Sequence, residues 1–244
     1  MRNIKLTISY DGTLYKGWQS QKNGRTVQQE IEKAILKIFG HHHTLYGASR
    51  TDSGVHAKGQ TANFKVSAVF PVSKISDALN AVLPADILIK RSEEVPLDFH
   101  SRFDAKSKLY RYSIVNSRTR DPFSDRYVWR VPYPLDAGLM DIEAGFLAGT
   151  HDFKCFQASD KKERSSIRNI TMARVRKTGR QLRVDIEGDG FLYNMVRNIA
   201  GTLVDIGRGY LPPGSMAKIL RSKDRKKAGP TAPARGLFLL KVRY

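Results

Sequence analysis

The sequence predicts an α+β protein of two ferredoxin-like halves that share a mainly antiparallel sheet, with helices packed on one face and a basic cleft. Strand-like and helix-like segments are mixed along the 244 residues, and each half holds strands and about two helices in a similar order. Two strand-like segments also connect directly around Thr178-Gly179, with no helix between them. Such direct connections favour antiparallel pairing, because parallel strands need a long crossover.

The first two elements are a strand and a helix. Residues 4–8 alternate apolar and polar side chains, which is typical of a strand with one buried face, and Gly12 lies just beyond its end. Thr26 and Gln29 then form a capping box ahead of apolar residues at helical spacing, and Gly40 supplies a stop. The pattern predicts a helix of about four turns at this place.

The remaining elements follow from the same two periodicities. Further strands are predicted at residues 60–66, 87–91, 108–115, 171–177, 182–187 and 237–242, and further helices at residues 72–83, 136–147 and 191–206. The boundary between the halves is predicted near residues 116–126. This divides the chain into an N-terminal half, residues 1–115, and a C-terminal half, residues 116–244.

The chain is strongly basic, with 42 Lys and Arg against 23 Asp and Glu and a net charge of +19. Such a charge favours a polyanionic partner, and nucleic acid is the first candidate. Basic residues concentrate in residues 161–183 and 221–227; each run could also be a solvated face. The candidates for binding RNA phosphates are Lys161, Lys162, Arg164 and Arg168.

Cysteine content and hydropathy bear on the compartment. A single cysteine, Cys155, cannot form an internal disulfide or a cysteine-based metal cage, so a reducing cytoplasm fits. No apolar run approaches the roughly 18 residues of a transmembrane helix. We therefore expect a cytoplasmic protein that does not enter a membrane.

The segment RTDSGVHA, residues 50–57, contains the most isolated acid of the chain. Asp52 is the only Asp or Glu between Glu32 and Asp77, and Arg50 and Lys58 flank it. Neighbouring positive charge lowers the pKa of a carboxyl group. We therefore expect Asp52 to lie at the floor of the basic active-site cleft and to be ionised near neutrality. An ionised carboxylate can act as a nucleophile but cannot act as a proton donor.

The helix predicted at residues 191–206 is apolar over most of its circumference, and Arg197 projects next to one of its apolar rows. A guanidinium in such a place needs an anion, because leaving it unpaired carries a large desolvation cost. Asp52 is the candidate partner. Alternatively, Arg197 pairs with Asp205 or extends to solvent.

Aromatic and histidine residues provide further candidates. Tyr110 and Tyr112 share one face of the strand at residues 108–115, where they are either core residues or a stacking platform for RNA bases. The three histidines at residues 41–43 point to alternate sides of an extended chain and cannot close one metal site. His56 and His100 are interpreted as structural hydrogen-bonding residues.

At seven places the chain resembles the tRNA pseudouridine synthases of the A type. The matching segments, in the family's order, are YDGTLYKGWQSQ (10–21), TVQQEIEKAI (26–35), RTDSGVHA (50–57), FHSRFDAKSKLYRYSI (99–114), HDFKCF (151–156), GFLYNMVRNIAGTLVDIG (190–207) and GPTAPARGLFLLKVRY (229–244). The sequence departs from the family pattern at Ser49, where Gly is usual, and at Ser53 and Ser101, where Ala is usual.

The resemblance implies a homodimeric, cofactor-free and metal-free isomerase that converts uridine to pseudouridine in the anticodon stem-loop of tRNA, around positions 38 to 40. It implies that Asp52 is the catalytic aspartate, that Arg197 pairs with it and that Tyr110 is the active-site tyrosine. The arginine that helps displace the target base corresponds to Arg50, and an apolar pocket residue corresponds to Leu239.

Two other functions fit parts of the sequence. The charge and the aromatic strand alone would permit an RNA-binding module with no chemistry, and the histidine run would permit a metal-dependent hydrolase. Neither accounts for Asp52 and Arg197. Whether Asp52 attacks the sugar, attacks the base or removes a sugar proton stays open at this level.

Overall fold

The computed structural model describes residues 1–158 and 165–244. Its internal contacts divide the chain into two compact units, which we describe separately. The first unit comprises Met1–Lys106 together with Leu239–Tyr244, and the second unit comprises Ser107–Phe238. This division lies before the strand that the sequence places at residues 108–115, whereas the predicted halves meet after it.

The first unit is a ferredoxin-like sheet with two helices. Its elements are β1 (Arg2–Tyr10), α1 (Val27–Phe39), β2 (Tyr46–Gly47), β3 (His56–Val66), α2 (Val72–Asn80) and β4 (Ile87–Val95). The strand order is β4-β1-β3, β2 pairs with β3, and all three pairings are antiparallel. This order of elements is the β-α-β-β-α-β motif. The final strand β10 (Leu237–Arg243) also lies beside β3.

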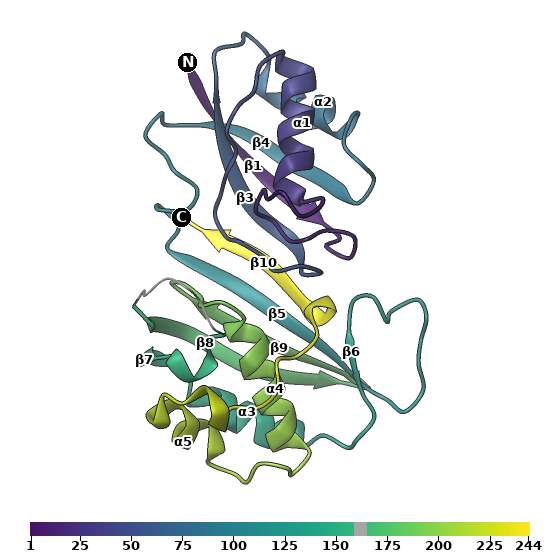
Figure 1. Cartoon of the computed structure of the whole chain (residues 1–244), viewed down its shortest axis with the longest axis vertical. Coiled ribbons are helices and arrows are strands. Elements are labelled where there is room, and N and C mark those ends of the chain that lie inside the picture. Colours follow the sequence, from purple (N-terminus) through teal and green to yellow (C-terminus); the bar gives the residue numbers. More distant parts are fainter. Residues whose placement is uncertain (159–164) are drawn as a thin grey trace. The chain divides into compact units, whose positions relative to one another are not determined.

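Alternation and capping explain the first elements of this unit. Ile4, Leu6 and Ile8 of β1 are completely buried. On α1, Val27, Ile31 and Ile35 are completely buried. Figure 1 shows α1 and α2 in front of the sheet formed by β1, β3 and β4. The predicted capping box is present at the start of α1, and Gly40 ends the helix with a φ of 76°.

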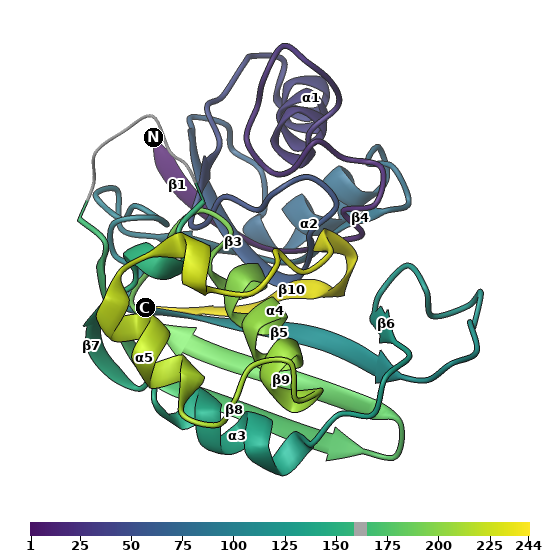
Figure 2. The ribbon, with the colours of Figure 1, turned by 60° about the horizontal axis from the view of Figure 1, so that its bottom comes forward.

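The second unit contains a four-stranded antiparallel sheet and three helices in the part that the structure describes. Its elements are β5 (Ser107–Asn116), β6 (Trp129–Val131), α3 (Ala137–Gly145), β7 (Gly149–Asp152), β8 (Ile167–Thr178), β9 (Gln181–Gly188), α4 (Met195–Gly207) and α5 (Ser215–Ser222). The order is β5-β9-β8-β7, and β6 adds a short parallel pairing with β5. Figure 2 shows α4 crossing β5 and β9, with α3 and α5 on the same side.

The predicted class is confirmed: the protein is α+β, and pairing is mainly antiparallel within each unit. The prediction for the helix at 191–206 was wrong at its start, because Asn194 has a φ of 59° and α4 begins only at Met195. Four elements, α5, β2, β6 and β7, were not predicted. The three strands are too short for a detectable alternation, and α5 overlaps a basic run.

Candidate active site

Asp52 lies in a tight turn between β2 and β3 that the neighbouring loop, residues 11–26, holds from both sides. The Trp18 backbone N–H donates to the Thr51 carbonyl at 3.1 Å, and the Gly54 N–H donates to the Tyr15 carbonyl at 3.2 Å. Within the turn, the Val55 N–H donates to the Asp52 carbonyl at 3.1 Å. Backbone groups on either side of Asp52 are therefore bonded, and its side chain is half-buried.

Two glycines allow this loop to approach the turn so closely. A Cβ atom on Gly12 would lie 2.0 Å from the Val55 carbonyl oxygen, and one on Gly17 would lie 2.4 Å from the Thr51 carbonyl oxygen. Gly17 also has a φ of +91°, which side chains other than glycine rarely adopt. The glycines of the segment YDGTLYKGW are thus needed for backbone-to-backbone packing around Asp52.

The residues before Asp52 are anchored from β1 and β3. The Thr51 hydroxyl lies 2.8 Å from the Tyr10 hydroxyl, and both side chains are buried. The Gln60 amide donates to the Ser49 carbonyl at 2.6 Å. Arg50, between these anchored residues, is exposed. The turn therefore holds its backbone firmly and directs the Arg50 side chain to solvent.

His56 contributes to the structure of the turn. It is 1% exposed, and its Nδ1 atom lies 3.0 Å from the Gly12 N–H group and 3.0 Å from Asp11 Oδ1. These contacts join the start of β3 to the end of β1. These contacts agree with the interpretation from the sequence that His56 is a structural hydrogen-bonding residue.

In the second unit, Arg197 lies on the first turn of α4 with its guanidinium held by two groups. Its Nε donates to the Ala232 carbonyl at 2.8 Å, and one terminal nitrogen donates to Asn194 Oδ1 at 2.9 Å. Asp205, the alternative partner considered above, instead accepts from Arg208 at 3.0 Å. The Arg197 side chain is half-buried.

The aromatic face of β5 is a core face. Tyr110 is 5% exposed and Tyr112 is completely buried, so the face is not an open stacking platform. The Tyr112 hydroxyl donates to the Pro233 carbonyl at 2.7 Å, and burial raises its pKa. The Tyr110 ring meets the Phe191 ring edge-on, with centroids 4.9 Å apart. This contact restrains one side of the Tyr110 ring.

The other predicted residues are distributed as follows. Leu239 is completely buried on β10, in the first unit with Asp52 and Arg50. Lys161, Lys162 and Arg164 lie outside the described residues. Arg168, which is described, donates to the backbone carbonyl of Ser165 at 2.7 Å.

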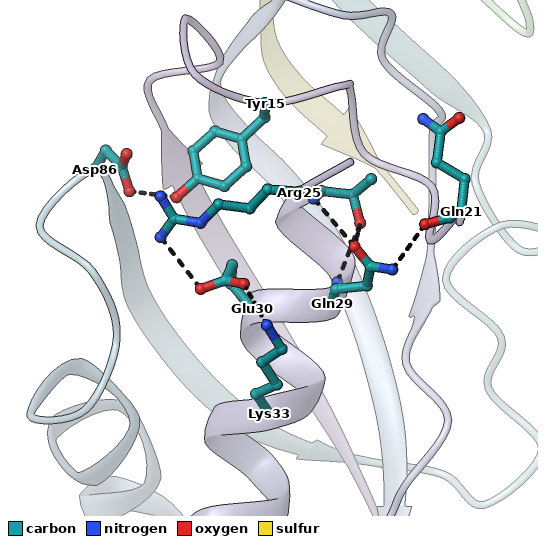
Figure 3. A network of polar contacts seen from close by, with 8 residues as sticks. Tyr15, Gln21, Arg25, Gln29, Glu30, Lys33 and Asp86 are labelled. Carbon is teal, nitrogen blue, oxygen red and sulfur yellow. Dashed lines mark hydrogen bonds and ion pairs between the residues drawn. The ribbon is translucent and has the colours of Figure 1, made fainter. Parts of the chain in front are cut away.

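Sequence reasoning missed Tyr15 and Asp86. Tyr15 is 1% exposed and its hydroxyl donates to the Asp86 carboxylate. Figure 3 shows the Arg25 side chain between the Tyr15 ring and Glu30. The Arg25 guanidinium carbon is 4.9 Å from the ring centre. The position of Tyr15 between the two glycines of the 10–21 segment is a signal that could have drawn attention to it. The sequence around Asp86 contains no signal that this residue bonds to Tyr15.

Within residues 1–158 and 165–244, no group of three or more His, Cys, Asp or Glu side chains is arranged to hold a metal ion. In the histidine run, His41 and His42 are exposed. The same part of the chain has no helix that is both long and apolar enough to span a bilayer.

Comparison with known proteins places the chain in a class, that of enzymes that modify RNA. The chain matches the family model described as tRNA pseudouridine synthase over residues 6–104 and 144–244, and it belongs to that family of isomerases. The match includes Asp52, Arg50, Arg197 and Leu239, whereas Tyr110 lies in the segment between the two matched regions. The resemblance seen in the sequence is therefore confirmed at the level of the family.

Curated relatives support the same assignment over full length. Proteins named tRNA pseudouridine synthase A are 49% identical in Clostridium acetobutylicum and 48% identical in Acetivibrio thermocellus, each over 100% of both chains. The solved structure of a Cbf5-Nop10-Gar1 complex overlaps 82% of this chain and 54% of its own, with 12% identity and a TM-score of 0.35. That overlap is too low to support a shared fold, so the family rests on the sequence relatives.

Proposed function

We propose that this chain converts uridine to pseudouridine in the anticodon stem-loop of tRNA, around positions 38 to 40, with Asp52 as the reacting carboxylate. Family membership supports the reaction and the tRNA substrate. The observation that supports Asp52 is its position: an isolated acid of a basic chain, half-buried in a turn whose flanking backbone groups are bonded.

The reaction has three parts. The bond between ribose C1′ and uracil N1 breaks and the uracil turns within the pocket. C5 then forms a new bond to C1′, the C5 proton leaves, and N1, released as an anion, takes up a proton. Cleavage of a glycosidic bond develops positive charge on the sugar, which a carboxylate facing it stabilises or attacks. Because the uracil stays in the pocket, a second carboxyl group to protonate a departing base is not needed.

The remaining site residues have distinct proposed roles. Arg197 pairs with Asp52 and keeps it ionised and oriented; its two bonds within the second unit pre-arrange the guanidinium for an anion. Tyr110, which is 5% exposed, is proposed to stack its ring on the extruded uracil and to assist removal of the C5 proton. Leu239 forms an apolar wall of the pocket, and exposed Arg50 helps to displace the target base from its stack.

Binding to tRNA draws on the charge of the whole chain. Turning a stacked uridine out of an RNA arm costs a few kcal/mol, which contacts to the phosphates must offset. The net charge of +19 suits this need. Lys161, Lys162, Arg164 and Arg168 are the proposed phosphate contacts, and the enzyme is proposed to act as a homodimer in the cytoplasm without a cofactor.

Release of tritium from tRNA labelled at uridine C5 tests this function, because every conversion replaces the C5 hydrogen. We expect the wild-type protein to release tritium from anticodon-arm uridines and Asp52→Ala to release none, with a Kd for tRNA within a few fold of wild type. Lys74→Ala, which removes an exposed charge from α2, is the control and should stay active. An Asp52→Ala variant that loses binding in proportion to activity would make Asp52 structural.

A further inference from the structure

Tyr15, in the loop between β1 and α1, makes hydrogen bonds at two separate places, through its side chain and through its backbone carbonyl. The Tyr15 side chain is buried, and its hydroxyl donates to Asp86 just before β4. Figure 3 shows the Arg25 side chain next to the Tyr15 ring. The backbone of Asp11 also donates to the Asp86 carbonyl at 2.9 Å. Side chain and loop are thus fastened to the same short segment of the first unit.

The second attachment of Tyr15 is its backbone carbonyl, which faces the Asp52 turn. It accepts the Gly54 N–H at 3.2 Å and the Ser53 hydroxyl at 3.2 Å. These are the two residues that directly follow Asp52. One carbonyl therefore restrains the turn immediately after the proposed catalytic residue, and its position depends on where the Tyr15 ring is held.

Contacts behind Tyr15 connect it to α1. The Lys16 N–H donates to the Arg25 carbonyl at 2.9 Å, and the Arg25 guanidinium bonds Glu30 at 3.1 Å. Glu30 also accepts from Lys33 at 2.9 Å. Because Arg25 and Glu30 are held by the start of α1, the loop cannot shift without breaking several contacts.

We propose that Tyr15 is a positioning residue for Asp52, acting through its carbonyl and held in place by the bond between its hydroxyl and Asp86. This inference rests on the proposed function, since orientation matters only if Asp52 reacts. A reacting group displaced by about 1 Å can lose on the order of 100-fold in rate. The Ser53 hydroxyl adds a second bond to the same carbonyl, so the residue after Asp52 is anchored through its side chain as well.

The test is single-turnover tritium release at saturating enzyme, which separates the rate on bound tRNA from binding. Tyr15→Phe keeps the ring and removes the bond to Asp86; we expect its maximal rate to fall about tenfold, with a Kd for tRNA within about twofold of wild type. Ser53→Ala should fall less, about two- to threefold, because the Gly54 bond to the same carbonyl remains.

A set of Asp86 variants distinguishes positioning from general damage. Asp86→Asn keeps an oxygen that accepts from Tyr15 and should restore most of the rate, whereas Asp86→Ala should be as slow as Tyr15→Phe. If the two residues act as one unit, the double variant Tyr15→Phe/Asp86→Ala will be no slower than either single variant. Rate losses that multiply in the double variant would overturn the inference.

Lys33→Met is the matched control, because the Lys33 side chain is 72% exposed and contacts only the outer end of the network. It should react at the wild-type rate. Active-site titration corrects each rate for misfolded protein, so a variant that is merely unstable will show a normal rate per active site and contradict the inference. A wild-type rate for Tyr15→Phe would overturn the positioning role alone, whereas absence of tritium release from the wild type would overturn the proposed function.

Discussion

The close packing of Gly17 against the Asp52 turn leads to a quantitative prediction. In Gly17→Ala, the new Cβ would lie 2.4 Å from the Thr51 carbonyl oxygen, well inside van der Waals contact, and the residue would keep a φ of +91°. A non-glycine residue at such a φ costs about 1–2 kcal/mol. Forcing an extra methyl group into a packed region costs a further 1–3 kcal/mol, so we expect a loss of about 2–5 kcal/mol.

Gly40→Ala is the matched control for this prediction. Gly40 also has a positive φ, +76°, but a Cβ there would meet nothing within 4 Å. Only the backbone term applies, and we expect a loss of about 1–2 kcal/mol. Urea unfolding at pH 7 measures both variants, and tritium release measures whether displacement of Thr51 also disturbs catalysis.

The difference between the two variants isolates the close approach of the loop to the turn. We expect Gly17→Ala to be less stable than Gly40→Ala by about 1–3 kcal/mol and to be the slower enzyme. Equal urea midpoints would refute the reasoning, because the contact with the Thr51 carbonyl would then contribute nothing.

Three further predictions concern charge and burial. Arg197→Ala should reduce activity and lower the free energy of unfolding. Because both Arg197 and its proposed partner Asp52 are half-buried, the loss should be smaller than the roughly 3–5 kcal/mol of a fully buried pair, and an unchanged melting curve would argue against the pairing. Burial alone would raise the pKa of Glu30, but hydrogen bonds from Lys33 and Arg25 outweigh it and lower the pKa. The stabilisation from these bonds is therefore complete above the pKa of Glu30 in the unfolded chain, about 4.3, and is lost as the pH falls through its lower pKa in the folded protein. Glu30→Gln lacks this titration, so its urea midpoint should depend less on pH in that range than the wild-type midpoint does. Burial raises the pKa of Cys155 to about 12, so a thiol reagent at pH 8 should label it only after unfolding; rapid labelling of native protein would contradict this.

Much of the fold could be predicted because its signals are local. Alternation in β1 and the capping box of α1 are visible within a few residues, and both elements are present. The start of α4 could not be predicted in this way. The apolar spacing continues N-terminal to Met195, but Asn194 adopts a left-handed backbone conformation, so the helix begins only after it. β2, β6 and β7 have two to four residues each, too few for a periodicity to show.

The candidate site, like the fold, was predictable only where its signal lies within a short stretch of sequence. Asp52 was found because isolation of one acid among basic residues is a property of the linear sequence. The contacts that hold its turn were not found, because Tyr15, Asp86 and Ser53 lie far apart in the chain and meet only when β1, β3 and β4 pair.

The sequence by itself determined the family, the strongly basic character and the type of most long elements, since composition, motif order and periodicity need no knowledge of distant neighbours. Only the tertiary structure decided that Tyr112 is core, that Asp205 binds Arg208, and that the Tyr15 carbonyl holds the residues after Asp52. Hydrogen bonds and close packing act over a few ångströms, and the groups that they join come together only when distant segments of the chain are brought side by side.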